Sequence, residues 1–104
     1  MDNPQKNYST MKSVLIIGSG FSALSASCFL AKAGWKVTVI EKHDQPGGRA
    51  RIFEKEGFTF DMGPSWYWMP DVFERFFEIF GHSVSDFYSL TRLDPSYRVF
   101  FEGG

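Results

Sequence analysis

The first half of the chain alternates short apolar runs with one longer helical pattern. Ser13–Ile17 is an uninterrupted apolar run rich in β-branched residues, which is typical of a strand buried on both faces of a parallel sheet. Residues 21–33 are mostly small or apolar, which predicts a helix packed closely on that sheet, with Gly34 as its end. A second strand is predicted over Lys36–Ile40. We therefore expect an α/β fold built on a right-handed βαβ unit.

The middle of the chain predicts a β-hairpin followed by a second helix. Residues 51–54 and Phe58–Asp61 form the expected strands, joined by a Lys-Glu-Gly turn. Pro70 fits the first position of a helix that ends at Gly81. Aromatic residues recur along this helix at spacings of three and four, which predicts one apolar face made of Phe73, Phe76, Phe77 and Phe80.

The last residues predict further strands. Two short strand-like pieces surround the Asp94-Pro95 break, and the second of them, residues 99–102, is followed by two glycines where a hairpin partner would begin. A parallel sheet of two or three strands is too small to cover both of its faces. We expect a loose polar tail over residues 1–11 and a domain over residues 12–104 that is the amino-terminal part of a larger protein. On its own, this chain is expected to aggregate and to be inactive.

Composition excludes several classes of function. The chain has 104 residues and a net charge of -1, so it offers no basic surface for nucleic acid. Cys28 is the single cysteine, expected as a small buried hydrophobe, and His43 and His82 stand apart from other metal-binding side chains. No disulfide framework or metal site is therefore expected. No apolar run reaches the roughly 18 residues of a membrane span, and the polar start is not a secretory signal.

A glycine-rich turn between the first strand and the first helix predicts a dinucleotide site. Gly18 permits a tight turn, Gly20 lets the backbone approach a pyrophosphate, and Ala23 replaces a third glycine at a position that accepts a methyl group. The N–H groups that begin the helix attract the diphosphate. Glu41 follows the second glycine by about 20 residues, where a carboxylate binds ribose hydroxyls and would repel the 2′-phosphate of NADP. The alternative for Glu41 is a solvated strand end beside Lys42.

Two later motifs narrow the choice of dinucleotide. Gly47, Gly48 and Arg49 follow the second strand, and the sequence FTFDMGP ends the hairpin. With the glycine turn and Glu41, these motifs resemble the FAD-binding amino terminus of the flavin amine oxidase and carotenoid desaturase superfamily. The resemblance implies that Gly48 and Arg49 lie against the FAD diphosphate and ribose, and that residues 61–66 approach the flavin ring. An NAD-only dehydrogenase has no reason to carry both motifs, so FAD is preferred to NAD.

Within that superfamily, the chain from Lys12 onward looks most like a bacterial-type phytoene desaturase. The resemblance implies a Rossmann-like, three-layer FAD domain, incomplete at its carboxyl end, and FAD-dependent desaturation of phytoene toward lycopene. It also implies a polyene substrate and a cytoplasmic enzyme peripheral to the membrane; oligomeric state and catalytic residues stay undetermined. The predicted cofactor-binding residues are Gly18, Ser19, Gly20, Phe21, Ser22, Ala23, Glu41, Lys42, Gly48, Arg49, Gly63, Pro64, Ser65 and Trp66.

Other interpretations stay open at this point. The enzyme could be another member of the superfamily, such as a different carotenoid desaturase, a retinol-saturase-like enzyme or an amine oxidase. The chain could also be a non-catalytic nucleotide-binding piece. The phenylalanine face of the second helix is either a packing face or a carotenoid contact. The same two alternatives apply to Trp66, Tyr67 and Trp68.

Overall fold

The computed structural model describes residues 11–103, and the chain divides into two compact units. The first unit ends at Ser65 and the second begins at Trp66. The predicted polar tail, apart from Met11, lies outside the described residues. The assignment of residues 12–104 to one domain stays a prediction.

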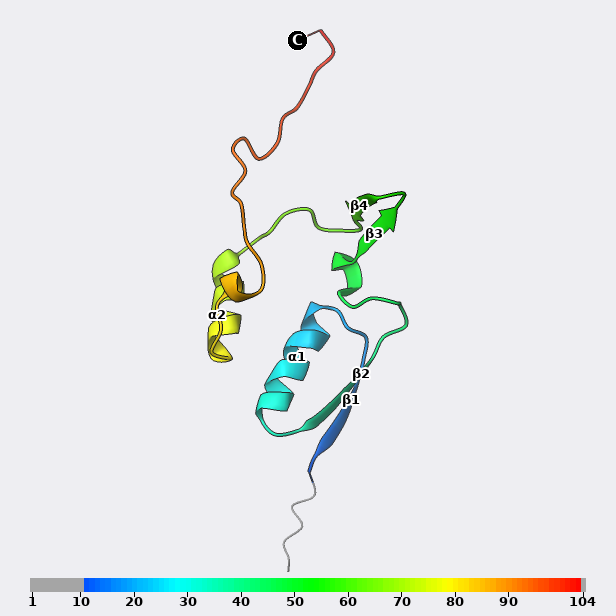
Figure 1. Ribbon diagram of the computed structural model, residues 1–104, viewed down its shortest axis with the longest axis vertical. Coiled ribbons are helices and arrows are strands. Elements are labelled where there is room, and N and C mark those ends of the chain that lie inside the picture. Colours follow the sequence, from blue (N-terminus) through cyan, green and yellow to red (C-terminus); the bar gives the residue numbers. More distant parts are fainter. Residues whose placement is uncertain (1–10, 104) are drawn as a thin grey trace, which may run out of the picture. The chain divides into compact units, whose positions relative to one another are not determined.

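The first unit begins with the predicted βαβ element (Figure 1). Strand β1 (Ser13–Ile17) and strand β2 (Lys36–Ile40) are parallel, and helix α1 (Phe21–Lys32) connects them. The register runs from Ser13 opposite Lys36 to Ile17 opposite Ile40. Helix α1 ends one residue earlier than predicted, because Ala33 already leaves helical geometry and Gly34 follows it. The α/β fold class and these three elements are confirmed.

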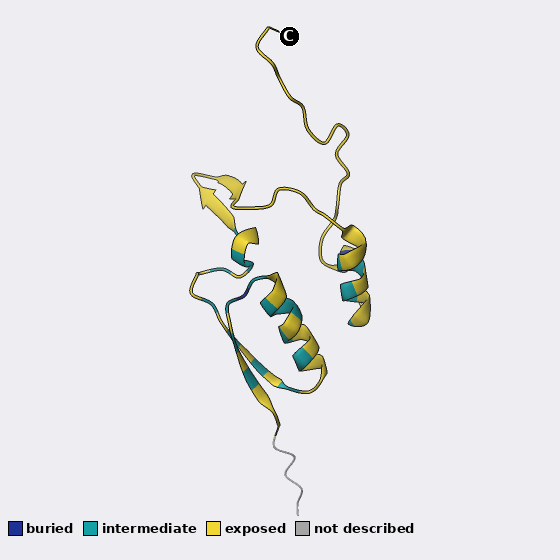
Figure 2. Ribbon diagram, turned by 180° about the vertical axis from the view of Figure 1, so that it is seen from behind, coloured by how far each residue is buried: buried dark blue, intermediate teal, exposed yellow. Residues whose placement is uncertain are grey.

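The two faces of the β1–β2 sheet are covered unequally (Figure 2). Helix α1 packs on one face, where the inward positions of both strands are half-buried. On the other face Leu15, Ile17 and Ile40 are 56%, 86% and 51% exposed. The prediction that β1 is buried on both faces is therefore wrong for this chain, because one helix covers one face of a sheet. Cys28 is also exposed, so its predicted burial is wrong: its side chain is on the part of α1 that does not pack on the strands.

The rest of the first unit is a short 3₁₀ turn and the predicted hairpin. The turn, η1 (Gly48–Ala50), precedes strand β3 (Ile52–Lys55), which pairs antiparallel with strand β4 (Phe58–Asp61). The strands are joined by two residues, Glu56 and Gly57, with φ of 52° and 83°. Positive φ at both positions gives a tight two-residue turn that matches the twist of a hairpin. The first strand therefore extends to Lys55, one residue further than predicted, and begins one residue later.

The second unit is built around helix α2 (Pro70–Ile79), which begins at Pro70 and is followed by Gly81 as predicted. A 3₁₀ turn, η2 (Val84–Asp86), packs on this helix. The Phe77 ring stacks on Phe87 with centroids 4.7 Å apart, and Val84 is 7% exposed. The phenylalanine face therefore packs partly against the chain that follows it. The sequence did not predict this cover, because η2 is too short to give a periodic signal.

The predicted strands near the carboxyl end are wrong. Residues 89–103 contain no helix or strand in the part of the chain that the structure describes. Phe100 and Phe101 are 85% and 77% exposed. A strand exists through hydrogen bonds to a neighbouring strand, and no described segment pairs with this one.

Candidate dinucleotide-binding site

The glycine turn leads directly from β1 into α1. The Gly18 N–H donates to the Ile40 carbonyl at 2.7 Å, which continues the β1–β2 ladder into the turn. Gly20 is the N-cap of α1, and the first turn of that helix holds no acidic residue. The N–H groups of a first helical turn have no partner within the helix, and the helix dipole makes this end attractive to an anion. The turn thus has the local charge that a diphosphate requires.

No contact within the chain itself requires a glycine at position 20. Its φ of -73° and ψ of 173° are open to any residue, and a Cβ added there would meet no described atom within 4 Å. The space in front of this residue is therefore open. A glycine with ordinary backbone angles beside open space suits a position that a ligand approaches closely.

Glu41, the first residue after β2, reaches back to the glycine turn. Its Oε2 accepts hydrogen bonds from the Ser19 hydroxyl at 2.6 Å and from the Ser19 N–H at 2.8 Å. Its Oε1 accepts from the His43 N–H at 3.0 Å. The Ser19 hydroxyl, followed by the His43 and Ser19 N–H groups, lowers the pKa of Glu41 from 4.5 to about 2. The carboxylate is therefore ionised at any physiological pH and is not a loosely solvated strand end.

This lowered pKa predicts a pH dependence of stability. The pKa of Glu41 is lower in the folded protein than in the unfolded chain, so its contribution is complete above pH 4.5 and is lost as the pH falls toward 2. Urea unfolding of wild type and Glu41→Gln should therefore differ at pH 6 and converge as the pH approaches 2. A constant difference across this range would show that the ionised carboxylate is not the stabilising group.

The Gly-Gly-Arg segment packs against the glycine turn. The Gly47 N–H donates to the Ser19 carbonyl at 2.8 Å. Gly48 has a φ of 61°, and a Cβ built on it would lie 3.0 Å from the Gly20 Cα. Both the backbone angle and the close approach favour glycine here. Two motifs that are far apart in the sequence are thus adjacent in the first unit.

The segment after the hairpin joins the same cluster. A Cβ on Gly63 would collide with the Arg49 carbonyl oxygen, so Gly63 lies directly against η1. The Met62 N–H also donates to the Arg51 carbonyl at 3.0 Å. Close backbone approach therefore explains the glycine in the Asp-Met-Gly motif. We call this cluster the glycine junction. It consists of the glycine turn, Glu41, η1 and Gly63.

The structure brings most of the predicted residues to the glycine junction. Phe21, Ser22 and Ala23 form the first turn of α1, and Lys42 is exposed beside Glu41. Pro64 and Ser65 follow Gly63 at the end of the first unit. Trp66 begins the second unit, where its ring meets Tyr97 with centroids 5.9 Å apart. The role of each residue toward a cofactor stays a prediction.

Three residues near the junction were not predicted. The Gln45 side chain donates to the Ile52 carbonyl at 2.9 Å and accepts from the Ile52 N–H at 3.2 Å. It therefore pairs with Ile52 as the backbone of a neighbouring strand would. The Arg51 Nε donates to the Gly48 carbonyl at 2.8 Å. His43 acts through its backbone N–H, which no sequence pattern indicates. All three hold the loop that carries the Gly-Gly-Arg motif.

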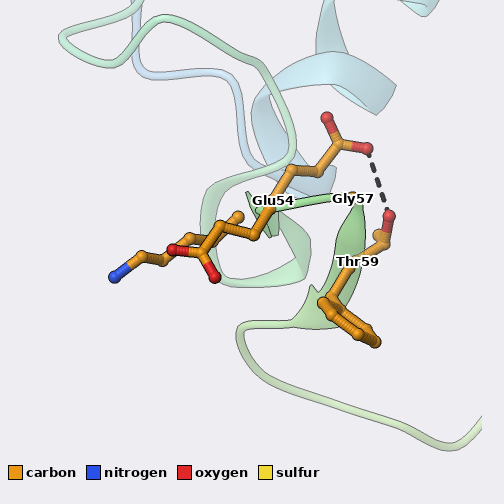
Figure 3. A pocket seen from close by; sticks show the side chains of 6 residues that line it. Glu54, Gly57 and Thr59 are labelled. Atoms are coloured by element: carbon orange, nitrogen blue, oxygen red, sulfur yellow. Dashed lines mark hydrogen bonds between the residues drawn. The ribbon is translucent and has the colours of Figure 1, made fainter.

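Two hollows of the first unit lie beside the hairpin. One, of about 260 Å³, is lined by the six residues 54–59. Figure 3 shows it with the hydrogen bond from the Thr59 hydroxyl to Glu54, at 3.2 Å. A larger open hollow of about 620 Å³ includes Gln45, Arg51 and Met62. Neither includes Gly18, Gly20 or Glu41.

Substitutions of Ala23 test how closely α1 must pack on β1. Ala23→Gly should leave FAD affinity nearly unchanged and cost up to about 1 kcal/mol of helix stability. Ala23→Val should displace the first turn of α1, in which Ala23 itself is half-buried, and abolish binding. Thermal unfolding and flavin titration of both variants measure these effects. Full affinity in the valine variant would disprove close packing as the reason for a small residue here.

The described residues hold neither a membrane-spanning helix nor a cluster of metal-binding side chains. Residues 11–103 contain no helix that is long and apolar enough to cross a membrane. Within the same range, no group of three or more His, Cys, Asp or Glu side chains could hold a metal ion.

Known proteins resemble this chain closely. A carotenoid 3,4-desaturase from Haloarcula japonica is 58% identical over 91 residues, which cover 88% of this chain and 18% of the relative. A zeta-carotene-forming phytoene desaturase from Myxococcus xanthus is 42% identical over 85% of this chain and 17% of its own length. A lycopene-forming phytoene desaturase from Pantoea ananas is 38% identical over 90% of this chain and 19% of its own. The chain thus matches carotenoid and phytoene desaturases and spans less than a fifth of their length.

A solved structure and a family of domains agree with the fold. A CLA-producing fatty acid isomerase from P. acnes superimposes with a TM-score of 0.53 and 26% identity, over 72% of this chain and 18% of that one. The family described as an NAD(P)-binding Rossmann-like domain matches residues 16–83, which include the whole glycine junction. This chain belongs to the family of NAD(P)-binding Rossmann-like domains.

Proposed function

We propose that this chain is the FAD-binding part of a longer carotenoid desaturase. The observation that carries the proposal is the glycine junction, where a helix N-terminus, an open glycine and an ionised carboxylate lie together. These groups suit the diphosphate and the ribose of a dinucleotide. The desaturase relatives, each more than 37% identical to this chain, support the reaction class.

The residues of the junction fit FAD on physical grounds. Glycine at position 20 leaves room for a diphosphate beside the N–H groups of α1, and Glu41 offers a carboxylate oxygen to a ribose. The Arg49 side chain lies on the segment held against Gly63, and it would add positive charge near the phosphates. FAD is preferred to NADP because an ionised Glu41 repels a 2′-phosphate. The Gly-Gly-Arg and Asp-Met-Gly segments, held together at the junction, supply a second group of backbone contacts that an extended cofactor could use.

When bound, FAD would supply the acceptor for a hydride that leaves an allylic carbon of the polyene. This chain would bind and orient the adenosine half of the cofactor. Its exposed aromatic residues after Gly63 would provide an apolar approach for a substrate, as Trp66 and Trp68 are 54% and 70% exposed. An apolar polyene resides in a bilayer, so we propose a cytoplasmic enzyme peripheral to the membrane. The membrane association rests on the substrate class, and the cytoplasmic location rests on the single cysteine, which suits a reducing compartment.

Among carotenoid substrates we propose phytoene, converted stepwise toward lycopene. The lycopene-forming relative from Pantoea ananas supports this choice. A second candidate is 3,4-desaturation of a carotenoid, favoured by the higher identity to the Haloarcula japonica relative. Both reactions remove hydrogen from adjacent carbons and would use the same cofactor site.

The reaction is tested under anaerobic conditions with the purified full-length protein. Liposomes that contain phytoene, lycopene or neither are mixed with the protein, and the flavin absorbance and the carotenoid products are followed. We expect phytoene to bleach the flavin and to yield a product with a longer conjugated system. Bleaching by lycopene alone would select 3,4-desaturation, and bleaching by neither would contradict carotenoid desaturation.

A further inference from the structure

Ser19 is the most buried polar residue of the glycine junction. It is 3% exposed, whereas the flanking residues Gly18 and Gly20 are half-buried. Its hydroxyl and its N–H both donate to Glu41, and its carbonyl accepts from Gly47. All of its polar atoms are thus used within the protein. A hydroxyl in this position is better placed to hold another residue than to bind a cofactor itself.

We infer that Ser19 is a positioning residue, whose hydroxyl fixes the Glu41 carboxylate in place for the ribose of the dinucleotide. This inference rests on the proposed function. It also revises the prediction that Ser19 contacts the cofactor directly. The Ser19 hydroxyl acts on the ribose through Glu41.

The hydrogen bonds of Glu41 show how this would work. Oε2 accepts two donors from Ser19, and Oε1 accepts one from the His43 N–H. A carboxylate has about four acceptor sites, two on each oxygen. Oε2 is therefore saturated, so a ribose hydroxyl would have to donate to Oε1, the oxygen that Ser19 does not occupy. Holding one oxygen from two directions restricts the rotation of the carboxylate, which lowers the entropy lost when a ribose binds.

The substitution Ser19→Ala separates this role from the backbone role of Ser19. It removes the hydroxyl and leaves two backbone hydrogen bonds of residue 19 unchanged. Its N–H still donates to Glu41, and its carbonyl still accepts from the Gly47 N–H. Ser27→Ala is a matched control, because the Ser27 hydroxyl donates to the Ala23 carbonyl at 2.7 Å within α1 and does not contact Glu41. Ser19→Thr keeps the hydroxyl and should restore the function.

The test is a double-mutant cycle on the full-length apoprotein, with dissociation constants of FAD measured by flavin fluorescence. Ser19→Ala should weaken FAD binding by about tenfold, the effect expected for one charge-assisted hydrogen bond. In a Glu41→Ala background the same substitution should have almost no effect, because its target is gone. Ser19→Thr should bind like wild type, and so should Ser27→Ala.

A second measurement separates ribose recognition from a general structural effect. ADP and 2′,3′-dideoxy-ADP compete with FAD, and their affinities are compared in each variant. Wild type should prefer ADP, and Ser19→Ala should lose most of that preference while binding the dideoxy compound equally well. Additive effects of Ser19→Ala and Glu41→Ala, or an unchanged preference for ADP, would overturn the role of Ser19. If wild type binds no FAD, the proposed function fails and this role fails with it.

Discussion

The full-length protein with Gly20→Ala should keep its fold and lose FAD. Alanine adopts the φ of -73° and ψ of 173° found at Gly20, and its Cβ would meet no described protein atom within 4 Å. The expected loss of stability is about 1 kcal/mol or less, because alanine is a weaker N-cap than glycine. The methyl group occupies the space where the diphosphate would approach the helix. Losing two or more charge-assisted hydrogen bonds of about 1.5–3 kcal/mol each corresponds to at least a 100-fold weaker affinity.

The matched control for Gly20→Ala lies at the other end of the same helix. Gly34 also faces open space, but its φ is 83°, which alanine adopts with strain. Gly34→Ala should therefore lower the melting temperature and leave FAD affinity unchanged, the reverse of the result at Gly20. Thermal unfolding of the apoproteins and fluorescence titration with FAD measure both effects. If Gly20→Ala binds FAD as tightly as wild type, the diphosphate does not lie at this turn.

Gly63→Ala should damage both stability and cofactor binding. The new Cβ would collide with the Arg49 carbonyl oxygen, a backbone atom that moves only if η1 moves. Overpacking of this kind costs about 1–3 kcal/mol. Displacement of η1 would also pull Gly48 away from Gly20, which it approaches closely. We expect a lower melting temperature and little or no FAD retained through gel filtration.

Gly57→Ala provides the comparison for Gly63→Ala. Gly57 has a φ of 83° in the hairpin turn, and a Cβ there would meet nothing within 4 Å. This variant strains the backbone without touching η1, so it should lose some stability and keep its FAD. Wild-type behaviour of Gly63→Ala in both assays would show that the close approach of Gly63 to Arg49 does not matter.

Local sequence signals predicted β1, the glycine turn and α1 correctly, whereas η1 was not predicted. The strand, the turn and the helix around Gly18 and Gly20 depend on short-range patterns of apolar residues and glycine. The spacing to Glu41 follows from the length of one helix and one strand. These features are therefore readable from the residues themselves.

Contacts between distant segments could not be read in this way. The hydrogen bonds from Ser19 to Glu41 and the approach of Gly63 to Arg49 depend on how loops fold back on each other. The predicted strand over residues 99–102 failed because a strand needs a partner, which the described part of the chain does not supply. The predicted burial of Cys28 failed because an apolar helix does not reveal which face packs on the sheet.

The identity of the bound dinucleotide tests the central claim most directly. Full-length apoprotein is titrated by calorimetry with FAD, NAD and NADP in parallel, with Gly20→Ala as the negative control. The account predicts that FAD binds at one site per chain, that NADP does not bind, and that Gly20→Ala abolishes the FAD signal. Binding of NADP in preference to FAD, or FAD binding that Gly20→Ala leaves intact, would contradict the proposed cofactor site.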